Sequence, residues 1–362
     1  MKKIGIATIF RTGNYGGTLQ AYALKEAINT NGFGNAEIIN YCCDAIKGKI
    51  DFKYLKKAGL LKTIAALVDK ACYAPRMKKM NHFIDSFVDT TEIKKEELPC
   101  LNDKYDIFLS GSDQLWNPDI QQEDFFYLLD FVVDAKKKKS YASSFGIRKI
   151  PEHLKEKYKY LLSNYSEITV REEAGAELVY QLLGIHPKIV LDPTLLLTPQ
   201  HWIEIMPENK KKKGKYIFVY RLTYSSKLTQ VAQVLQKRLN CHVVSAPFLL
   251  GVCHKNRMKP NLSSLEWAGE IYNSEFVITD SFHGVVFSII FSKQFYYMVT
   301  TQTAKERLSR VETLLSSLEI SNRIINNADE CKFEEIIDYE IVHKRLREQR
   351  DVSLVVLREM LS

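Results

Sequence analysis

The chain has 362 residues, which is enough for about two domains. Lys and Arg number 51 against 43 Asp and Glu, a net charge of +8, and 46% of the residues are hydrophobic, which excludes a disordered or fibrous chain. No apolar run reaches the ~18 residues of a membrane-spanning helix, and no signal-peptide cleavage site follows the first apolar residues. Seven scattered cysteines without a CxxC pair indicate neither a disulfide framework nor a zinc site, so we expect a cytoplasmic protein.

The first half of the chain alternates short apolar strands with amphipathic helices. Residues 3–10 form a predicted strand that ends in a glycine-rich turn, and residues 18–31 have one apolar helical face. The next strand completes a β–α–β unit, which is typical of a parallel α/β sheet. Further strands are predicted at 36–41, 106–110, 138–145, 167–170 and 188–191, with helices at 151–163 and from 171–173 onward.

A second α/β set follows residues 199–215, which are polar and basic, contain two prolines and are interpreted as a linker. Strands are predicted at 216–221, 242–246, 276–279 and 295–299, and helices at 225–239, 263–273, 284–291, 306–318 and from 334 to the end.

The sequence therefore predicts an α/β fold with two Rossmann-like domains and a central cleft. The N-terminal domain spans 1–198 and the C-terminal domain 199–330, and a helix in 331–362 is expected to pack back on the N-terminal domain. Ligands of such sheets bind beyond the carboxyl ends of the strands. Four unusual turns follow predicted strands, at 11–17, 111–117, 171–173 and 280–284.

The net charge lies in one segment of the N-terminal half. Residues 45–80 hold ten basic and two acidic side chains, a sum of +8, so the rest of the chain is formally neutral. Apolar residues are interleaved with the basic ones, which predicts a basic amphipathic insertion. We expect it to face an anionic membrane surface; the alternatives are a solvated surface and an oligomer contact, and the sequence leaves the oligomeric state open.

The turn RTGNYGG joins the first strand to a helix N-terminus. Gly16 and its neighbouring glycines let the backbone approach an anion there. Asn14 and Tyr15 are candidates to contact a sugar hydroxyl. The alternative is an ordinary tight turn.

The turn SGSDQLWN places Ser112 and Asp113 at a strand end, followed by Trp116 and Asn117. A carboxylate, an amide and a stacking ring suit a sugar. The alternative is that Asp113 caps a helix while Trp116 lies in the core.

Cations follow three other strands. Arg171 ends ITVR, where a guanidinium can clamp a carboxylate or phosphate; the alternative is an ion pair with a glutamate beside it. Lys305 and Arg310 begin a helix, where cations oppose the helix dipole and so point to an anionic partner; the alternative is a solvated basic face, and Arg221 is a weaker candidate of the same kind.

The turn ITDSFHG presents Ser281 and His283 at the start of an apolar helix. A histidine there can move a proton close to a bound anion. A Ser–His–Asp hydrolase is disfavoured, because the three residues share one turn and no GxSxG elbow exists. No cluster of metal ligands occurs in the sequence.

At these motifs the sequence resembles the polysaccharide pyruvyl transferase family. The matching segments are GNYGGTLQAYAL, YDIFLSGSDQLWN, SYASSFG, ITVREE, LDPTLLL, FVITDSFHG and KERLSRVETLL, in family order across about residues 4–325. The resemblance implies a GT-B-like fold, phosphoenolpyruvate as donor, no cofactor, and a sugar acceptor on a polysaccharide or a lipid-linked precursor. It also implies that His283, Arg171, Lys305 and Arg310 contact the donor.

The chemistry of that reaction fits these residue types. We expect His283 to protonate the enol or to hold the leaving phosphate, and Asp113 to be the base for the sugar hydroxyl. The closest alternative is a nucleotide-sugar glycosyltransferase on the same fold, which needs a pyrophosphate loop that the sequence does not show. A carbohydrate-binding protein without activity and a nucleic-acid binder are further alternatives, and no nucleic-acid motif supports the last.

Overall fold

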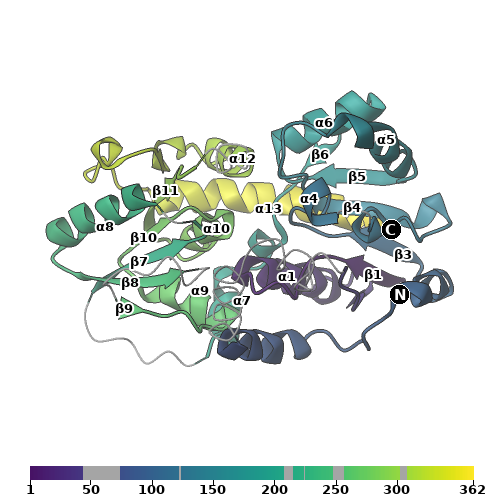
Figure 1. Cartoon of the computed structure of the whole chain (residues 1–362), viewed down its shortest axis with the longest axis horizontal. Coiled ribbons are helices and arrows are strands. Elements are labelled where there is room, and N and C mark those ends of the chain that lie inside the picture. Colours follow the sequence, from purple (N-terminus) through teal and green to yellow (C-terminus); the bar gives the residue numbers. More distant parts are fainter. Residues whose placement is uncertain (44–73, 122–123, 208–214, 224, 248–256, 302–307) are drawn as a thin grey trace, which may run out of the picture.

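The computed structural model describes residues 1–43, 74–121, 124–207, 215–223, 225–247, 257–301 and 308–362. Two parallel sheets of six strands each form the two halves of the molecule (Figure 1). This α/β architecture is the predicted one.

The first sheet has the strand order β2-β1-β3-β4-β5-β6, and its described pairs are all parallel. Because β2 and β3 lie on either side of β1, the direction of winding reverses between β1 and β3. The strands are β1 (Lys3–Ala7), β2 (Asn35–Ile38), β3 (Ile107–Ser110), β4 (Lys138–Ser143), β5 (Glu167–Val170) and β6 (Lys188–Ile189).

The second sheet has the order β12-β11-β10-β7-β8-β9, again with parallel pairs. Here the winding reverses between β7 and β10. The strands are β7 (Tyr216–Arg221), β8 (His242–Pro247), β9 (Arg257–Met258), β10 (Phe276–Thr279), β11 (Gln294–Met298) and β12 (Ile324–Ile325).

The helices cover the faces of these sheets and lie between them (Figure 1). Those in the first half are α1 (Tyr15–Thr30), a helix over residues 74–85, α4 (Pro118–Gln121), α5 (Lys155–Ser163) and α6 (Glu173–Leu183). Those that follow are α7 (Pro199–Ile205), α8 (Ser226–Leu239), α9 (Ser264–Asn273), α10 (Phe282–Ile290), α12 (Ser309–Ser317) and α13 (Tyr339–Leu361).

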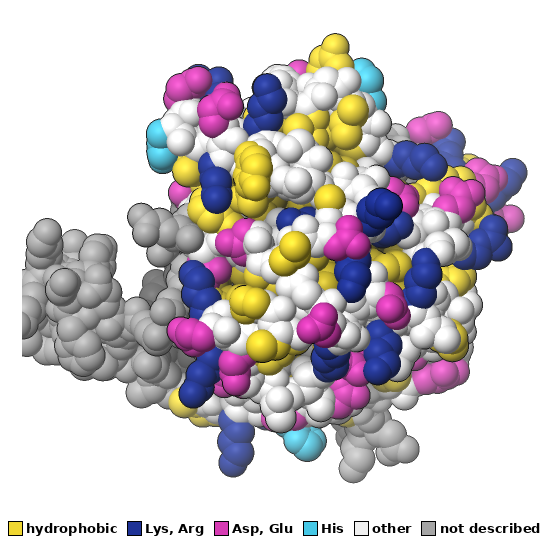
Figure 2. Space-filling model, turned by 90° about the vertical axis from the view of Figure 1, so that its right-hand side faces the viewer, with side chains coloured by type: hydrophobic (Ala, Val, Ile, Leu, Met, Phe, Trp, Pro, Cys, Tyr) yellow, Lys and Arg dark blue, Asp and Glu magenta, His cyan; other side chains and the backbone are white. Residues whose placement is uncertain are grey.

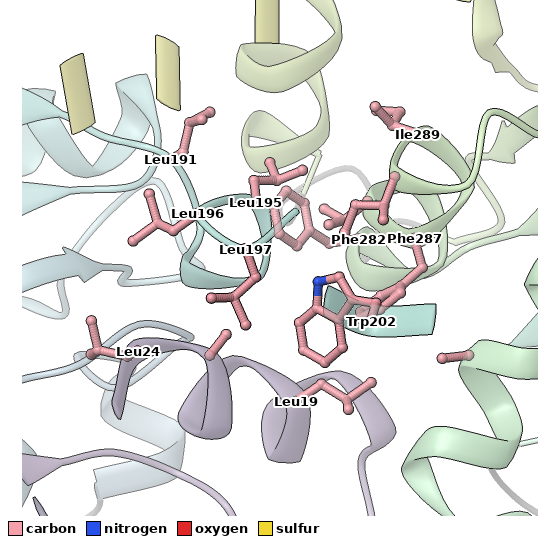
Figure 3. Packing of buried hydrophobic residues seen from close by; sticks show 14 of the residues in the cluster. Leu19, Leu24, Leu191, Leu195, Leu196, Leu197, Trp202, Phe282, Phe287 and Ile289 are labelled. Carbon is pink, nitrogen blue, oxygen red and sulfur yellow. The ribbon is translucent and has the colours of Figure 1, made fainter. Parts of the chain in front are cut away.

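A shared hydrophobic core joins the two halves. Leu19 of α1, Trp202 of α7 and Phe287 of α10 point toward one another in this core (Figure 3). The Trp202 indole stacks edge-on against Phe287 and donates to the carbonyl of Thr194. Burial of such large side chains stabilises each by roughly 1.5–3 kcal/mol. The core therefore holds the two sheets in a fixed relation, which positions their strand ends.

Helix α13 runs from the second half to the first (Figure 1). Its His343 contacts Ser292 after α10, whereas its Ser353 accepts from the amide of Leu191 and Arg350 donates to the carbonyl of Leu195. This single helix thus spans both halves.

Two of the differences between the predicted elements and the structure affect the linker and the candidate site. Residues 199–205 are helix α7 rather than linker, because Thr198 caps the helix and proline fits its first turn. The apolar helix expected from residue 284 begins at Phe282, so His283 lies inside the first turn of α10.

Most of the basic insertion lies outside the described residues. The expectation that the segment faces a membrane therefore stays a prediction, and two of its described cations contact other parts of the chain. Arg76 is buried over the Tyr15 ring and donates to the carbonyl of Gly13, and Lys79 pairs with Glu266 of α9 at 2.9 Å. On the face in Figure 2, positive and negative side chains are interspersed. None of the described helices is both long and apolar enough to cross a membrane.

Candidate active site at the strand ends

The points where the winding reverses in the two sheets face one cavity of about 260 Å³. Parallel α/β sheets bind ligands at such points, beyond the carboxyl ends of their strands. Residues that follow β1, β3, β7 and β10 all line it, together with α12. The lining residues are Ile9, Thr12, Asn14, Asp113, Gln114, Ile120, Leu222, Thr223, Asp280, Ser281, Phe282, His283, Tyr297, Thr300, Thr301, Arg310 and Val311.

His283 lies on the wall of this cavity, in the first turn of α10. Ser281 caps that helix by accepting from the amide of Gly284 at 3.4 Å. A Cβ atom at Gly16 would lie 2.2 Å from Cγ and Nδ1 of His283. Gly16 is therefore required for the close approach of α1 to the imidazole. This corrects the expectation that Gly16 contacts an anion.

Asn14 caps α1 and also lines the cavity. Its side-chain oxygen accepts from the amides of Gly16 at 3.0 Å and Gly17 at 3.5 Å. The glycines of this turn were expected to bind an anion through their backbone. The Asn14 side chain already accepts hydrogen bonds from these two amides.

A cluster of buried charges lies beneath the cavity. Arg171 donates to Asp192 at 2.7 Å and contacts Asp113 at 3.4 Å, and Arg310 lies 3.7 Å from the same oxygen of Asp113. All four residues are less than 10% exposed. Arg171 is not among the residues that line this cavity, but it lines the larger cavity described below. Its close partners are Asp192 and Asp113, with Glu172 at 3.9 Å, and its predicted role as a clamp for an anion stays a prediction.

Asp113 is held in a left-handed backbone conformation with φ of +79°. Such a conformation is uncommon for a residue with a side chain and marks a position that its surroundings enforce. Burial acts to raise the pKa of Asp113, but the charges of Arg171, His283 and Arg310 outweigh burial and lower it. Asp113 is consequently a carboxylate at neutral pH, with its charge next to the cavity.

Asp192 is a site residue that the sequence reasoning missed. It follows β6 in the segment LDPTLLL and is 1% exposed. Burial acts to raise its pKa, but His283, Arg171 and the hydrogen bond from Thr194 hold that pKa well below the usual range. The Asp-Pro pair has the signature of a helix cap, and Asp192 does cap the turn at Pro193–Leu195. No spacing in the sequence linked it to His283.

Glu172 is the third carboxyl of the cluster. Its Oε1 accepts from Ser144 at 2.7 Å, and its Oε2 lies 3.9 Å from Nε of Arg171. Burial raises the pKa of Glu172, and the nearby Arg171 and Arg310 offset this only in part.

Arg310 brings the second half of the chain to the cluster. Contacts between α12 and α6 fix its helix, because the hydroxyls of Ser309 and Thr313 accept from the first amides of α6 at 3.2 Å. The side-chain amide of Gln114 lies 3.0 and 3.2 Å from the two terminal nitrogens of Arg310. Burial and the neighbouring Arg171 lower the pKa of Arg310 to about 10, so it is still a cation at neutral pH.

Asp280 links two strand ends across the cavity. Its carboxylate accepts from the amides of Leu222 at 2.6 Å and Thr223 at 3.0 Å, so it fixes the turn after β7 to the turn after β10. Burial raises its pKa, and these hydrogen bonds counteract that effect in part.

Several predicted site residues lie away from the cavity. Trp116 is fully buried against Phe145 and Tyr165, so it belongs to the core and cannot stack on a sugar. Tyr15 is buried too, stacked on Trp267. The structure corrects these two expectations. The Trp116 ring fills the interior of the first half, and the Tyr15 ring fills the contact between the two halves.

The remaining predicted residues have structural contacts or lie outside the described residues. Ser112 donates to Asp192 at 3.1 Å, and Asn117 accepts from the amide of Asp119 at the start of α4. Arg221 is buried at the end of β7, outside the cavity lining. Lys305 lies outside the described residues.

A second cavity, of about 610 Å³, lies on the other side of Phe282 and Arg310, which line both cavities. The Phe282 ring separates the two, with the guanidinium of Arg171 4.5 Å and that of Arg310 5.8 Å from its centre. Helices α12 and α13 and residues 189–195 supply most of its wall, and Arg171 and Asp192 are among the residues that line it. His283 and Asp113 are not among the described residues that line it.

The described residues form no group of three or more His, Cys, Asp or Glu side chains that could hold a metal ion. The groups available for chemistry in the strand-end cavity are a histidine, carboxylates and a guanidinium.

The architecture is GT-B-like, and solved structures with similar folds agree. UDP-GlcNAc 2-epimerase from Rickettsia bellii aligns with a TM-score of 0.51 at 11% identity, covering 99% of this chain and 95% of its own. The enzyme from Neisseria meningitidis bound to UDP-GlcNAc gives 0.51 at 9%, covering 98% and 100%. These identities establish a shared fold only.

The family is established by the sequence. The model of the polysaccharide pyruvyl transferase family matches residues 14–301, well over half of the chain, and the chain belongs to that family. It is accordingly a transferase that acts in polysaccharide pyruvylation. No curated protein matches the sequence.

Proposed function

We propose that the protein transfers the enolpyruvyl group of phosphoenolpyruvate to two hydroxyls of a sugar, forming a pyruvate ketal and releasing phosphate. The observation that carries this proposal is the convergence of His283, Arg310 and Asp113 on one cavity at the ends of the strands. A proton donor, a cation and a carboxylate are the groups that the reaction needs. Family membership supports the proposal but does not fix the donor.

The donor is a small anion with a phosphate and a carboxylate, and Arg310 is the cation that faces it. The N-terminus of α10, a nine-residue helix, adds a favourable dipole at the same wall. The cavity of about 260 Å³ suits a donor of this size.

The first step is an addition to the enol. His283 gives a proton to the methylene carbon, the double bond supplies the electron pair of the new C–H bond, and the neighbouring carbon becomes electrophilic. A sugar hydroxyl oxygen bonds to that carbon and passes its proton to Asp113. Each such proton transfer contributes about 10²–10⁴-fold to the rate.

The second step closes the ketal. The other sugar hydroxyl attacks the same carbon, the bond from that carbon to the phosphate oxygen breaks, and phosphate leaves with the electron pair. The proton of this hydroxyl goes to phosphate, and the proton on Asp113 returns to His283 through solvent. Atoms and charge then balance, because one sugar diol and one phosphoenolpyruvate give one ketal and one phosphate.

The test is incubation with phosphoenolpyruvate and a panel of glycan acceptors, with phosphate release and a pyruvyl mass addition as readouts. Melting curves serve as the second measurement. Phosphoenolpyruvate should raise the Tm, whereas UDP- and GDP-sugars should not. Stabilisation by a nucleotide sugar alone would instead support the glycosyltransferase alternative.

A further inference from the structure

The two ring nitrogens of His283 have different surroundings. Nε2 is buried without a hydrogen-bond partner in the described structure and lies 3.6 Å from Oδ2 of Asp192. The opposite edge of the ring, with Cγ and Nδ1, lies against Gly16 at the start of α1. His283 lines the strand-end cavity, and of its two ring nitrogens Nε2 is the one buried without a partner, which leaves Nδ1, beside Gly16, as the nitrogen for a donor.

Asp192 is fixed more firmly than the histidine it faces. Its Oδ2 accepts from Arg171 at 2.7 Å and from Ser112 at 3.1 Å, while its Oδ1 accepts from the Thr194 amide and hydroxyl at 3.1 and 2.6 Å. A carboxylate held by four hydrogen bonds cannot turn to follow a ligand. It presents Oδ2 to the imidazole in one orientation only.

We infer that Asp192 is the positioning residue of His283, and that Nδ1, not Nε2, delivers the proton to the donor. This inference rests on the proposed function for the identity of the proton acceptor. In this assignment the contact between Nε2–H and the Asp192 carboxylate fixes the ring orientation and leaves the transferable proton on Nδ1. The separation of 3.6 Å is slightly longer than a hydrogen bond, and contacts of this kind shorten when a substrate binds.

The proton transfer from His283 to the donor balances in bonds and charge. The Nδ1–H bond of the imidazolium breaks, its electron pair stays on the ring, and the proton bonds to the methylene carbon of the enol. The product is a neutral imidazole that keeps its Nε2–H toward Asp192. Asp192 itself is never protonated, and its charge stabilises the imidazolium before the transfer.

Amide replacements test the choice of nitrogen without altering Asp192. The amide nitrogen of Asn overlaps Nδ1 of histidine, and that of Gln overlaps Nε2. His283→Asn should keep the affinity for phosphoenolpyruvate within about threefold, whereas His283→Gln should lose about tenfold, since a hydrogen bond to a charged group contributes this much. Tighter binding by His283→Gln would overturn the assignment of Nδ1.

The contact with Asp192 is tested in the free protein by nitrogen-15 resonances of histidine. We expect an Nε2-bound proton of His283 that exchanges slowly with solvent, and loss of this slow exchange in Asp192→Asn. Asp280→Asn is the matched control, because Asp280 is buried at the same cavity but contacts backbone amides of Leu222 and Thr223. A slowly exchanging proton on Nδ1, or no change in Asp192→Asn, would refute the contact.

Kinetics separate positioning from a merely structural role. Asp192→Asn should lower kcat about 10²–10⁴-fold, leave the KM for phosphoenolpyruvate nearly unchanged and increase the solvent deuterium isotope effect. A raised KM with an unchanged isotope effect would mean that Asp192 only supports the fold. If wild-type protein does not use phosphoenolpyruvate, the proposed function fails, whereas the resonance experiment still decides the contact with His283.

Discussion

Two cavities meet at Phe282, and the larger of them is the one that His283 and Asp113 do not line. The larger, of about 610 Å³, is walled mainly by helices α12 and α13 and residues 189–195, with apolar side chains such as Leu314 and Val352 beside the charged Arg171 and Asp192. The smaller, of about 260 Å³, lies at the ends of strands from both sheets and is lined by His283, Asp113 and Arg310.

The smaller cavity is the one on which the reversal points of both sheets converge, and each of their turns contributes a polar side chain. The larger cavity meets the first sheet at Arg171 and residues 189–195, and helices α12 and α13 supply most of the rest of its wall. We therefore propose that the reversal points, rather than volume, locate the chemistry in this fold. Arg310 lines both, so it is the residue through which the comparison can be tested most directly.

The largest expected effect shows which of the two cavities holds the reacting groups. His283→Ala should lower pyruvyl transfer about 10²–10⁴-fold, because the proton donor of the first step is lost. Val352→Trp, which adds bulk to the larger cavity, should stay within about threefold of wild type. Both variants are assayed with phosphoenolpyruvate under saturating acceptor, with the melting curve as the control for folding. If His283→Ala transferred pyruvyl groups within tenfold of the wild-type rate, His283 would not be a catalytic residue. A large loss of rate in Val352→Trp would place the chemistry in the larger cavity.

The next effect distinguishes the two guanidinium groups between the cavities. Arg310→Gln should raise the KM for phosphoenolpyruvate about 10- to 100-fold with a smaller change in Tm, because a charge-assisted contact to the donor is lost. Arg171→Gln should chiefly lower the Tm, since it leaves Asp192 and Asp113 without their close partner in the interior.

Initial rates across donor concentrations and melting curves of both variants provide the measurements. If Arg171→Gln raised the KM while the Tm of the protein stayed high, Arg171 would contact the donor after all. The donor would then bind from the side of the larger cavity.

Much of the fold could be predicted because its signals are local. The strands are short apolar runs between turns, and the glycine-rich turn before α1 follows from its composition. Helix α7 was missed because Pro199 and the lysines that follow it suggest a linker, whereas proline is well accommodated in the first turn of a helix. The short pairings of β9 and β12 depend on neighbouring strands that no local pattern reveals.

The site was predicted less completely, because its contacts join distant segments. His283, Asp113 and Arg310 could be named from their positions after strands or at a helix start. Asp192 could not, since its partner His283 lies about ninety residues further along the chain. Trp116 was misassigned because composition does not tell whether an aromatic ring faces a ligand or the core. The structure decides this by placing the ring between Phe145 and Tyr165.

The smallest expected effect is on the melting temperature and concerns Glu172 in the cluster of buried charges. Burial raises the pKa of Glu172 above its ordinary value, so the folded protein binds a proton there that the unfolded chain has already released. This contribution to stability is fully present below the ordinary pKa of about 4.5 and is lost as pH rises through the raised value. Glu172→Gln, which stays neutral, should therefore melt about 2 °C above wild type at pH 8 and lose this advantage toward pH 4.

Melting curves of the two proteins across that range provide the measurement. A difference that does not change with pH would mean that Glu172 is ionised and paired with Arg171 in the folded protein. The cluster would then hold three carboxylates against two guanidinium groups and would repel an anionic donor from both cavities. If Glu172 is neutral, the carboxylates of Asp113 and Asp192 balance the guanidinium groups of Arg171 and Arg310, and the cluster does not repel an anionic donor. The pH dependence of this one variant thus tests why the smaller cavity can accept an anion.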